Sequence, residues 1–274
     1  MISWDVSPQI FELGPIQLRW YGVLFALGFY FGFQIFRYAF HHENRPGADL
    51  DPLLIYCVAG TLIGARLGHC FFYEPEYFLK NPLEVFKIWK GGLASHGGVL
   101  GMLFSNWVYS RRRMSRWPER FKKGIDLPWL WLMDRVAIGA ALGSALIRLG
   151  NLMNSEIIGK PTESDWGFVF VRVDSVLRHP AQLYESGVYF LLFFLLWGIY
   201  RKMRKALPHG LLLGLFLLIV FPARWAIENF KESQVAFEEG LMSQYGFNLG
   251  QILSVPFAFI GMILLIRVFL SRAK

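Results

Sequence analysis

Seven long apolar segments, separated by short polar ones, divide the chain. They cover residues 21–40, 53–73, 92–109, 127–146, 183–200, 210–230 and 249–270. A helix needs about 20 predominantly apolar residues to cross the ~30 Å of hydrocarbon in a bilayer. The pattern therefore predicts an all-α integral membrane protein with about seven transmembrane helices.

Every second connection between these segments is rich in Lys and Arg. Residues 111–123 contain seven of them and residues 201–205 contain four. Arg37 and Arg45 lie at the end of the first segment and just after it, and the chain ends in SRAK. Cytoplasmic loops collect Lys and Arg. We therefore expect the amino terminus outside and the carboxyl terminus in the cytoplasm.

The composition agrees with a protein that lies in lipid. Of 274 residues, 54% are hydrophobic and 18% are charged, which excludes a disordered chain, a disulfide scaffold and an ordinary water-soluble domain. The net charge of +8 comes from short blocks between apolar segments, which fits anionic lipid headgroups rather than nucleic acid. Asp5 and Glu12 precede the first segment without a cationic start, so we expect no removable signal peptide.

We expect a single polytopic domain over residues 1–274, without internal repeats and with a small extracytoplasmic head inserted at about 155–180. The head sequence is polar and aromatic, and 168–173 is a candidate strand. Glycines recur at four-residue spacing, as in Gly60, Gly64 and Gly68 and in Gly28 and Gly32. Such spacing favours close packing of helices, which is the expected role of most of them.

Ionisable residues within or beside the apolar segments are candidates for function, because a charge near the bilayer centre costs ~2.5–3.5 kcal/mol on insertion scales. The expected topology brings eight of them toward the outer leaflet and leaves two deeper or on the inner half. The eight are Arg66, His69, His96, Arg148, Glu156, Glu185, Arg224 and Glu228, and the two are Asp134 and Arg135.

His96 lies among four glycines, Gly91, Gly92, Gly97 and Gly98. Glycine costs about 1 kcal/mol relative to alanine inside a helix, so this cluster indicates close approach of a ligand or of another backbone. The histidine can exchange a proton or bind a headgroup, or it can be a satisfied polar residue at a tight helix crossing. No histidine spacing here is typical of a metal site.

Arg148, Asn151, Asn154, Glu156 and Gly159 form a second group, in IRLGNLMNSEIIG. In a helix, Arg148, Asn151 and Asn154 share one face. A guanidinium fork beside two amides suits a phosphodiester, since Arg binds phosphate oxygens bidentately. The alternative is a polar cap where the fourth segment leaves the membrane.

Arg224 and Glu228 stand at i and i+4, the spacing of an intrahelical ion pair. Such a pair is more often structural than catalytic, but it falls at the same outer rim as His96 and Arg148. Tyr21 in LRWYG is an interfacial anchor or a headgroup contact.

Seven motifs carry a resemblance to a known family. In chain order they are WYG, ARLG, GGLASHGG, RLGNLMNSEIIG, RHPAQLYES, ARWAIENFKE and GQILSVP. With these motifs the sequence resembles the bacterial prolipoprotein diacylglyceryl transferases over nearly its whole length. Each motif is weak by itself, but seven in order are specific.

The resemblance implies a transferase of the bacterial cytoplasmic (inner) membrane, with seven spans and an extracytoplasmic active site. Its implied lipid donor is phosphatidylglycerol, and its implied acceptor is the lipobox cysteine in the signal peptide of a prolipoprotein. The diacylglyceryl group forms a thioether with that cysteine and glycerol 1-phosphate is released, which is the first step of lipoprotein maturation. No metal, cofactor or nucleic acid is implied.

The resemblance also implies a set of site residues. Its essential histidine falls on His96, its signature on the group from Arg148 to Gly159, and its late pair on Arg224 and Glu228. We expect a catalytic set of His96, Arg148 and Arg224, and a substrate-binding set of Tyr21, Arg66, Gly97, Gly98, Asn151, Asn154, Glu156, Gly159 and Glu228. His96 is the candidate base for the thiol, although it can equally orient lipid.

Three positions depart from the family pattern. Ile147 and Ser155 replace usual glycines, and Leu152 replaces a usual phenylalanine. These departures concern the local backbone geometry of the signature rather than its polar groups.

Two other classes remain open. A transporter or flippase would line a cavity with Arg and His, but it should show an inverted repeat and polar groups through both leaflets. A non-catalytic lipid-binding subunit gives no reason for a histidine inside a glycine cluster.

Overall fold

The computed structural model describes residues 1–13, 16–45, 47–88, 91–111, 127–232, 247 and 249–272. The chain forms two compact units, one of Met1–Phe36 with Met133–Lys274 and one of Arg37–Leu132. The expectation of one domain over the whole chain remains a prediction, and each unit is considered by itself below.

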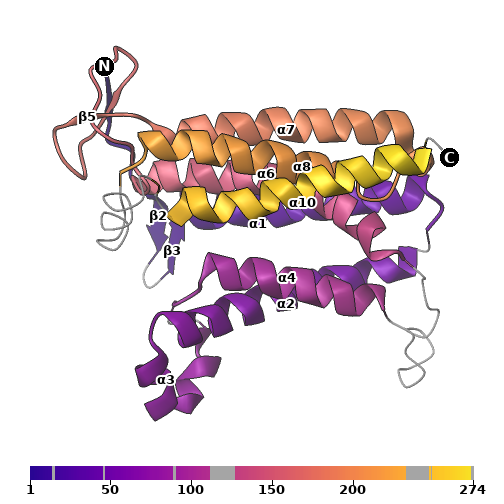
Figure 1. The fold of residues 1–274 in the computed structure, drawn as a ribbon. Coiled ribbons are helices and arrows are strands. Elements are labelled where there is room, and N and C mark those ends of the chain that lie inside the picture. The colour runs from indigo at the N-terminus through magenta and orange to yellow at the C-terminus, as the bar shows by residue number, and fades with distance from the viewer. Residues whose placement is uncertain are drawn as a thin grey trace. The chain divides into compact units, whose positions relative to one another are not determined.

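The first unit is a bundle of long helices (Figure 1). They are α1 Trp20–His42, which continues into the second unit, α6 Trp129–Asn154, α7 Ala181–Met203, α8 Leu211–Ile227 and α10 Leu249–Arg272. Short 3₁₀ turns, η4 Arg204–Ala206 and η5 Glu228–Phe230, follow α7 and α8. The inner face of α6 is fully buried at Ile138, Ala141 and Ala145, so α6 contributes the centre of this unit.

A buried carboxylate fixes the start of α8 to α6. Asp134 of α6 is fully buried, and its Oδ2 and Oδ1 accept hydrogen bonds from the backbone N–H groups of Gly210 (2.7 Å) and Leu213 (2.9 Å). The first N–H groups of a helix lack partners within the helix, and their positive end attracts a carboxylate. Asp134 therefore caps α8 from a neighbouring helix, at the end of α8 opposite to Arg224.

The second unit contains η1 Gly47–Asp49, α2 Leu50–Phe72, α3 Pro75–Lys80, η2 Pro82–Phe86 and α4 Ser95–Ser110. Glycines line the contact between α2 and α4. A Cβ atom at Gly64 would overlap the backbone of Gly97 and Gly101, and one at Gly60 would overlap Ser105 and Gly101. The predicted close packing of helices at these glycines is confirmed.

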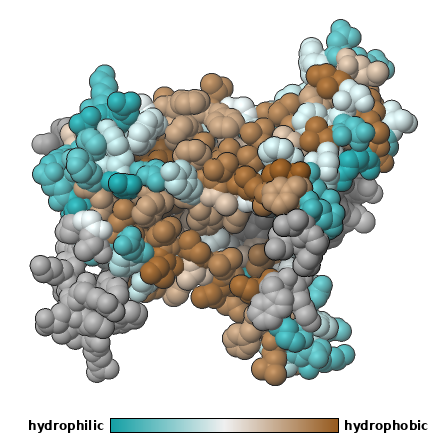
Figure 2. Space-filling view, turned by 180° about the vertical axis from the view of Figure 1, so that it is seen from behind, coloured by the Kyte–Doolittle hydropathy of each residue, from teal (hydrophilic) through white to brown (hydrophobic). Residues whose placement is uncertain are grey.

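The prediction of a multi-pass helical protein is confirmed, with one difference in detail. Within the described residues, six helices are long and apolar enough to cross a membrane, namely α1, α2, α6, α7, α8 and α10. The remaining predicted segment, 92–109, forms α4, whose 16 residues span about 24 Å at 1.5 Å per residue. Apolar side chains cover the middle of the helices, and hydrophilic ones gather near their ends (Figure 2).

A small sheet lies at one end of the first unit. β1 Ile2–Trp4 pairs in parallel with β4 Phe168–Phe170, which pairs antiparallel with β5 Leu177–Arg178. The expected strand at 168–173 is thus correct for its first three residues, after which the chain turns. A hairpin of β2 Gln9–Leu13 and β3 Ile16–Arg19 also precedes α1, and no pattern in the sequence had indicated it.

Candidate functional site

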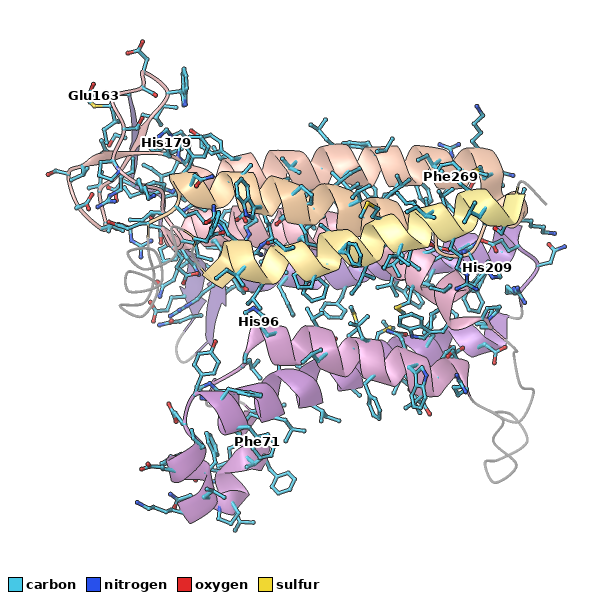
Figure 3. The ribbon with its side chains drawn as sticks, viewed as in Figure 1. Phe71, His96, Glu163, His179, His209 and Phe269 are labelled. Atoms are coloured by element: carbon cyan, nitrogen blue, oxygen red, sulfur yellow. The ribbon has the colours of Figure 1, made fainter. Side chains whose placement is uncertain are left out.

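Four parts of the first unit meet at the end of the bundle that carries the sheet. They are the last turns of α6, the loop 155–160, the first turns of α7, and the end of α8 with η5. His179, which leads into α7, marks this end, and His209 marks the opposite end (Figure 3). The polar side chains of these four parts form a connected network.

Glu185 is the centre of this network. Its side chain is fully buried, and its two carboxylate oxygens are divided between two cations. Oε2 lies 2.7 Å from Nε of Arg148, and Oε1 lies 2.9 Å from Nζ of Lys231. Lys231 also lies 3.1 Å from Oε2 of Glu228, so α6, α7 and the end of α8 are joined by buried ion pairs.

The amides of the signature extend the network from Arg148 to Glu156. Arg148 donates from Nη1 to Oδ1 of Asn151 (3.2 Å), and Asn151 donates to Oε2 of Glu156 (3.1 Å). Asn154 donates to the other oxygen of Glu156, also at 3.1 Å. The predicted shared face of Arg148, Asn151 and Asn154 is confirmed, because α6 continues as a helix to Asn154.

Gln182 supports Glu156 from α7. Its Nε2 donates to the backbone carbonyl of Glu156 at 2.6 Å, which assigns the other amide atom as the oxygen. That Oε1 is buried and has no hydrogen-bond partner among the described residues. The side chain therefore offers a free acceptor beside the signature.

The loop after α6 has an unusual backbone conformation. Ser155 and Ile157 have positive φ angles of 55° and 56°, in the left-handed region that glycine adopts most easily. This conformation explains why the family pattern usually has a glycine at the position of Ser155. The turn directs Glu156 back toward α6, where its N–H donates to the carbonyl of Asn151 at 2.9 Å.

Gly159 is required for close approach. A Cβ atom there would overlap the carbonyl oxygen of Phe230 and the backbone and side chain of His179. The Gly159 N–H donates to the carbonyl of His179 (3.0 Å), and the residue forms an antiparallel bridge with Lys231. Gly159 therefore brings the signature loop against the segment that follows α8.

Arg224 joins the network through Tyr189. Tyr189 lies next to the guanidinium groups of both Arg148 and Arg224. Glu185 and Glu228 are the carboxylates that act on Arg224 electrostatically. The two arginines expected to bind phosphate are thus neighbours of one phenol. Among the described residues, Glu228 forms its ion pair with Lys231, at 3.1 Å, rather than the expected one with Arg224.

Tyr21 lies at the edge of the same network. Its ring and backbone pack against Gly150 of α6, where a Cβ atom would come within 2.8 Å of the ring. Glu156 and Arg148 are its charged neighbours. The structure thus brings Tyr21 together with Arg148, Asn151, Asn154, Glu156, Gly159, Arg224 and Glu228.

The other expected site residues belong to the second unit. Arg66 is buried there, and its guanidinium donates to backbone carbonyls of the segment 84–92, including Val85 (2.9 Å) and Gly91 (2.7 Å). It also lies over the ring of Phe78, at 4.9 Å from the centroid. Arg66 therefore holds the chain that leads into α4, and a role in substrate binding remains a prediction.

His96 lies exposed in the first turn of α4 (Figure 3). Gly97 packs against the backbone of Gly64 and Gly68, and Gly98 packs against Ala65 and Thr61. Helix packing therefore accounts for these two glycines, whereas the exposed imidazole needs another explanation. The catalytic role of His96 and the substrate-binding role of Gly97 and Gly98 remain predictions.

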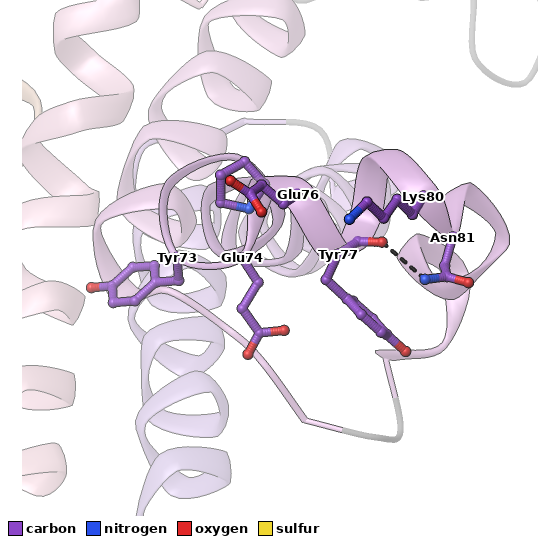
Figure 4. A pocket seen from close by; sticks show the side chains of 7 residues that line it. Tyr73, Glu74, Glu76, Tyr77, Lys80 and Asn81 are labelled. Carbon is purple, nitrogen blue, oxygen red and sulfur yellow. Dashed lines mark hydrogen bonds between the residues drawn. The ribbon is translucent and has the colours of Figure 1, made fainter.

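A shallow pocket lies on α3 of the second unit (Figure 4). It is lined by Tyr73, Glu74, Pro75, Glu76, Tyr77, Lys80 and Asn81. The Asn81 amide donates to the carbonyl of Tyr77 at 3.1 Å, so it serves the turn after α3. Flexible, exposed side chains of both charges line this pocket, which gives it no fixed binding geometry.

The network of the first unit is suited to bind an anion and hydroxyl groups together. Two guanidinium groups and an ammonium group provide donors, and the amide and carboxylate oxygens around Glu156 provide acceptors. In the part of the chain that the structure describes, no group of three His, Cys, Asp or Glu side chains is placed to hold a metal ion.

The sequence alone did not reveal four members of this network. The sequence marks Glu185 as an ionisable residue in a span but predicts no role for it. No sequence pattern singles out Gln182, Tyr189 or Lys231. Gln182 and Glu185 stand in the motif RHPAQLYES, so the motif itself was the available signal. Tyr189 follows Glu185 by one helical turn, and Lys231 lies just beyond the late Arg and Glu pair.

Known proteins resemble the chain over almost its whole length. The family model described as prolipoprotein diacylglyceryl transferase matches residues 8–267. A phosphatidylglycerol–prolipoprotein diacylglyceryl transferase from Chloroherpeton thalassium is 50% identical over 266 residues, covering 97% of this chain and 94% of the relative. Proteins of the same name from Tolumonas auensis and Bacteroides fragilis are 47% and 40% identical, and cover 100% and 95% of this chain and 100% and 92% of their own lengths.

The resemblance inferred from seven motifs is therefore confirmed, and so is the expected class of enzyme, a transferase. The matched region includes both units and every expected site residue. The chain belongs to the prolipoprotein diacylglyceryl transferase family.

Proposed function

We propose that this chain transfers the diacylglyceryl group of phosphatidylglycerol to the thiol of the lipobox cysteine of a prolipoprotein. The names of its relatives state this donor and this kind of acceptor. The observation that carries the proposal is that Arg148 and Arg224, from two different helices, both lie next to Tyr189 and Glu185 at one end of a helical bundle.

The reaction is an alkylation of sulfur. The thiolate attacks the glyceryl carbon that bears the phosphate, a carbon–sulfur bond forms, and the carbon–oxygen bond breaks with its electron pair on the phosphate oxygen. Glycerol 1-phosphate leaves as a phosphomonoester with more negative charge than the diester. Groups that bind this developing charge lower the barrier, and a missing donor of this kind costs about 10²–10³ in rate.

Arg148 and Arg224 suit that role. An arginine keeps its charge in every protein environment and presents donors in a planar fork that matches phosphate oxygens. Side chains rather than backbone hold both guanidinium groups, so a ligand can replace some of these partners. Glu228 and Glu185 keep the two cations close together.

The groups around Glu156 suit the glycerol headgroup. Its hydroxyls can donate and accept hydrogen bonds. The Asn151 and Asn154 amides, the Glu156 carboxylate and the free Oε1 of Gln182 provide the partners. Tyr21 adds a phenol at the edge. Gly159 contributes by its close packing against Phe230 and His179, which positions the loop 155–160.

His96 is the proposed base for the thiol. A free thiol has a pKa of ~8.5, so a base or a positive field must favour the thiolate. The imidazole is exposed on α4, where a glycine follows it and leaves it unshielded. Arg66, Gly97 and Gly98 of the second unit keep the chain around His96 in place.

We place the enzyme in the bacterial cytoplasmic membrane, with the amino terminus outside and the active site toward the outer leaflet. The basic segments at 111–123 and 201–205 support this orientation. The prolipoprotein is secreted, so its cysteine is presented on that side of the membrane. The proposal includes no cofactor and no nucleic acid.

The test is reconstitution with both substrates. Purified protein in detergent or vesicles is incubated with phosphatidylglycerol and a lipobox peptide, and mass spectrometry follows the peptide cysteine and the released glycerol phosphate. We expect a diacylglyceryl adduct on sulfur with one glycerol phosphate for each adduct. A peptide that stays unmodified, or lipid movement without an adduct, would favour the transporter or the lipid-binding subunit.

A further inference from the structure

Lys231 is a buried lysine with two carboxylate partners. Its exposed fraction is 7%, and its Nζ lies 2.9 Å from Oε1 of Glu185 and 3.1 Å from Oε2 of Glu228. A buried ammonium group is expensive unless it is fully paired, so this arrangement has a structural or functional reason. No step of the proposed function uses Lys231.

Lys231 limits how Glu185 can bind Arg148. A carboxylate and a guanidinium commonly form two parallel hydrogen bonds. Here Oε1 of Glu185 lies 2.9 Å from Nζ of Lys231, and Oε2 lies 2.7 Å from Nε of Arg148. Nη1 of Arg148 donates to Asn151, on the side where the amides of the signature lie.

The lysine also sets the charge of the cluster. Arg148, Arg224 and Lys231 contribute three positive charges, and Glu185, Glu228 and Glu156 contribute three negative ones, so the network is neutral before the lipid binds. A phosphodiester adds a further −1. Without Lys231 the network would already carry −1, and the phosphate would compete with Glu185 for Arg148.

The backbone of Lys231 is fixed to the signature loop. Lys231 bridges Gly159, and the N–H of Lys160 donates to the carbonyl of Phe230 at 2.8 Å. The N–H of Glu232 donates to the carbonyl of Ile158 at 3.3 Å. This pairing sets the place of the ammonium group, so its position is determined by the fold.

We propose that Lys231 is a positioning residue for the lipid phosphate: it binds Glu185 so that Arg148 keeps its donors for a monoanionic phosphodiester. The inference rests on the proposed function, because it assigns the phosphate of the lipid donor to Arg148. Lys231 acts through Glu185 and Arg148 and does not touch the reacting carbon.

Steady-state kinetics with phosphatidylglycerol and the lipobox peptide test this role. We expect Lys231→Met to lower kcat/KM for the lipid by about 10–100-fold, with an unchanged KM for the peptide. Lys231→Arg should stay within a few-fold of wild type. The double variant Lys231→Met with Glu185→Gln restores the wild-type charge of the network and should recover about ten-fold over Lys231→Met.

The matched control is Lys160→Met, which removes an exposed lysine from the loop 155–160 that pairs with this segment. The proposal is overturned if Lys231→Met behaves like Lys160→Met, if both KM values change equally, or if the double variant gains nothing. Should Lys231→Met fail to accumulate, Lys231→Arg and Lys231→Gln decide. If Lys231→Arg keeps its kcat/KM for the lipid and Lys231→Gln loses it, the role is supported. Equal kcat/KM values of the two variants oppose it.

The wild type separates this inference from the proposed function. A wild-type protein that forms no adduct contradicts the proposed function itself. A wild type that forms the adduct, together with Lys231 variants that match the control, contradicts only the role of Lys231.

Discussion

Arg66, which is buried, and Arg148, which is half-buried, have opposite kinds of partners. Arg66 donates to backbone carbonyls between residues 84 and 92, whereas Arg148 contacts the side chains of Glu185 and Asn151 and lies next to Tyr189. Backbone carbonyls cannot move without unfolding the loop, but side chains can rotate when a ligand arrives. Sequence patterns place both residues among the polar groups of the spans, and only the partners separate a structural cation from one able to bind phosphate.

The largest expected effect is a loss of activity in Arg148→Lys. A lysine keeps the charge but has no fork, so it cannot bind Glu185, Asn151 and a phosphate together. We expect kcat/KM in the adduct assay to fall by about 10²–10³-fold, with little change in thermal unfolding. Arg172→Lys, at an exposed arginine of the head, is the control, and full activity of Arg148→Lys would refute the phosphate role.

The next effect concerns the pH dependence of His96→Gln. A histidine base accepts a proton only in its neutral form, so wild-type activity should fall at acidic pH. We expect His96→Gln to lose about 10²-fold in kcat/KM and to lack this acidic limb. The exposed His41→Gln is the control. An unaltered limb with near-normal turnover would assign His96 to lipid orientation instead.

Arg66→Met should act on stability. Removing the guanidinium leaves several carbonyls of the segment 84–92 without donors, which we expect to cost about 3 kcal/mol of unfolding free energy. Thermal unfolding of the purified variant measures this loss, with Lys80→Met as the exposed control. A variant that unfolds like the wild type but has a raised KM for lipid would show that Arg66 binds substrate.

A third arginine, Arg178, extends the comparison to the head. Its side-chain hydrogen bonds to Asp174 (2.6 Å at the closest) lower the pKa of that carboxyl. A lowered pKa stabilises the fold above the pKa of unfolded Asp, and this stability is lost as the pH falls through the folded pKa. Asp174 is partly exposed, so the loss should be about 1 kcal/mol or less. Hydrogen exchange of β4 and β5 below pH 4 measures it, and Asp174→Asn should abolish this pH dependence.

The smallest effect is expected at Ser155. Its φ of 55° strains a serine, and glycine adopts this conformation without strain. Glycine also loses more conformational entropy on folding, so the net stabilisation by Ser155→Gly should be about 0.5 kcal/mol. Ser155→Ala keeps the strain but removes the buried hydroxyl, which has no partner among the described residues. Thermal unfolding of the two variants separates strain from the unpaired hydroxyl. A loss of stability in both would contradict this account.

Sequence patterns predicted the helices well because bilayer thickness and hydrophobicity act locally. The segment 127–146 was nevertheless too short, since α6 continues to Asn154 through a polar stretch that hydropathy does not count as a span. The strands of the head were mostly missed for another reason. β1 pairs with β4 across more than 160 residues, and three-residue strands leave no periodic signal.

The polar site was predicted in part for similar reasons. Arg148, Asn151 and Asn154 follow from helical spacing within one element. Lys231 and Glu185 meet only because the loop 155–160 pairs with the residues after α8, a contact that no local pattern contains. Residue types indicated the chemistry, whereas the folded chain assigns each cation its anion.

The carboxylate of Asp134 has a consequence for the far end of α8. It accepts hydrogen bonds from the N–H groups of Gly210 and Leu213. Arg224 lies 14 residues after Gly210, or about 21 Å at the helical rise. Because the start of α8 is hydrogen-bonded to α6, α8 cannot slide along α6, and the position of Arg224 beside Arg148 is set by a carboxylate at the opposite end of the helix.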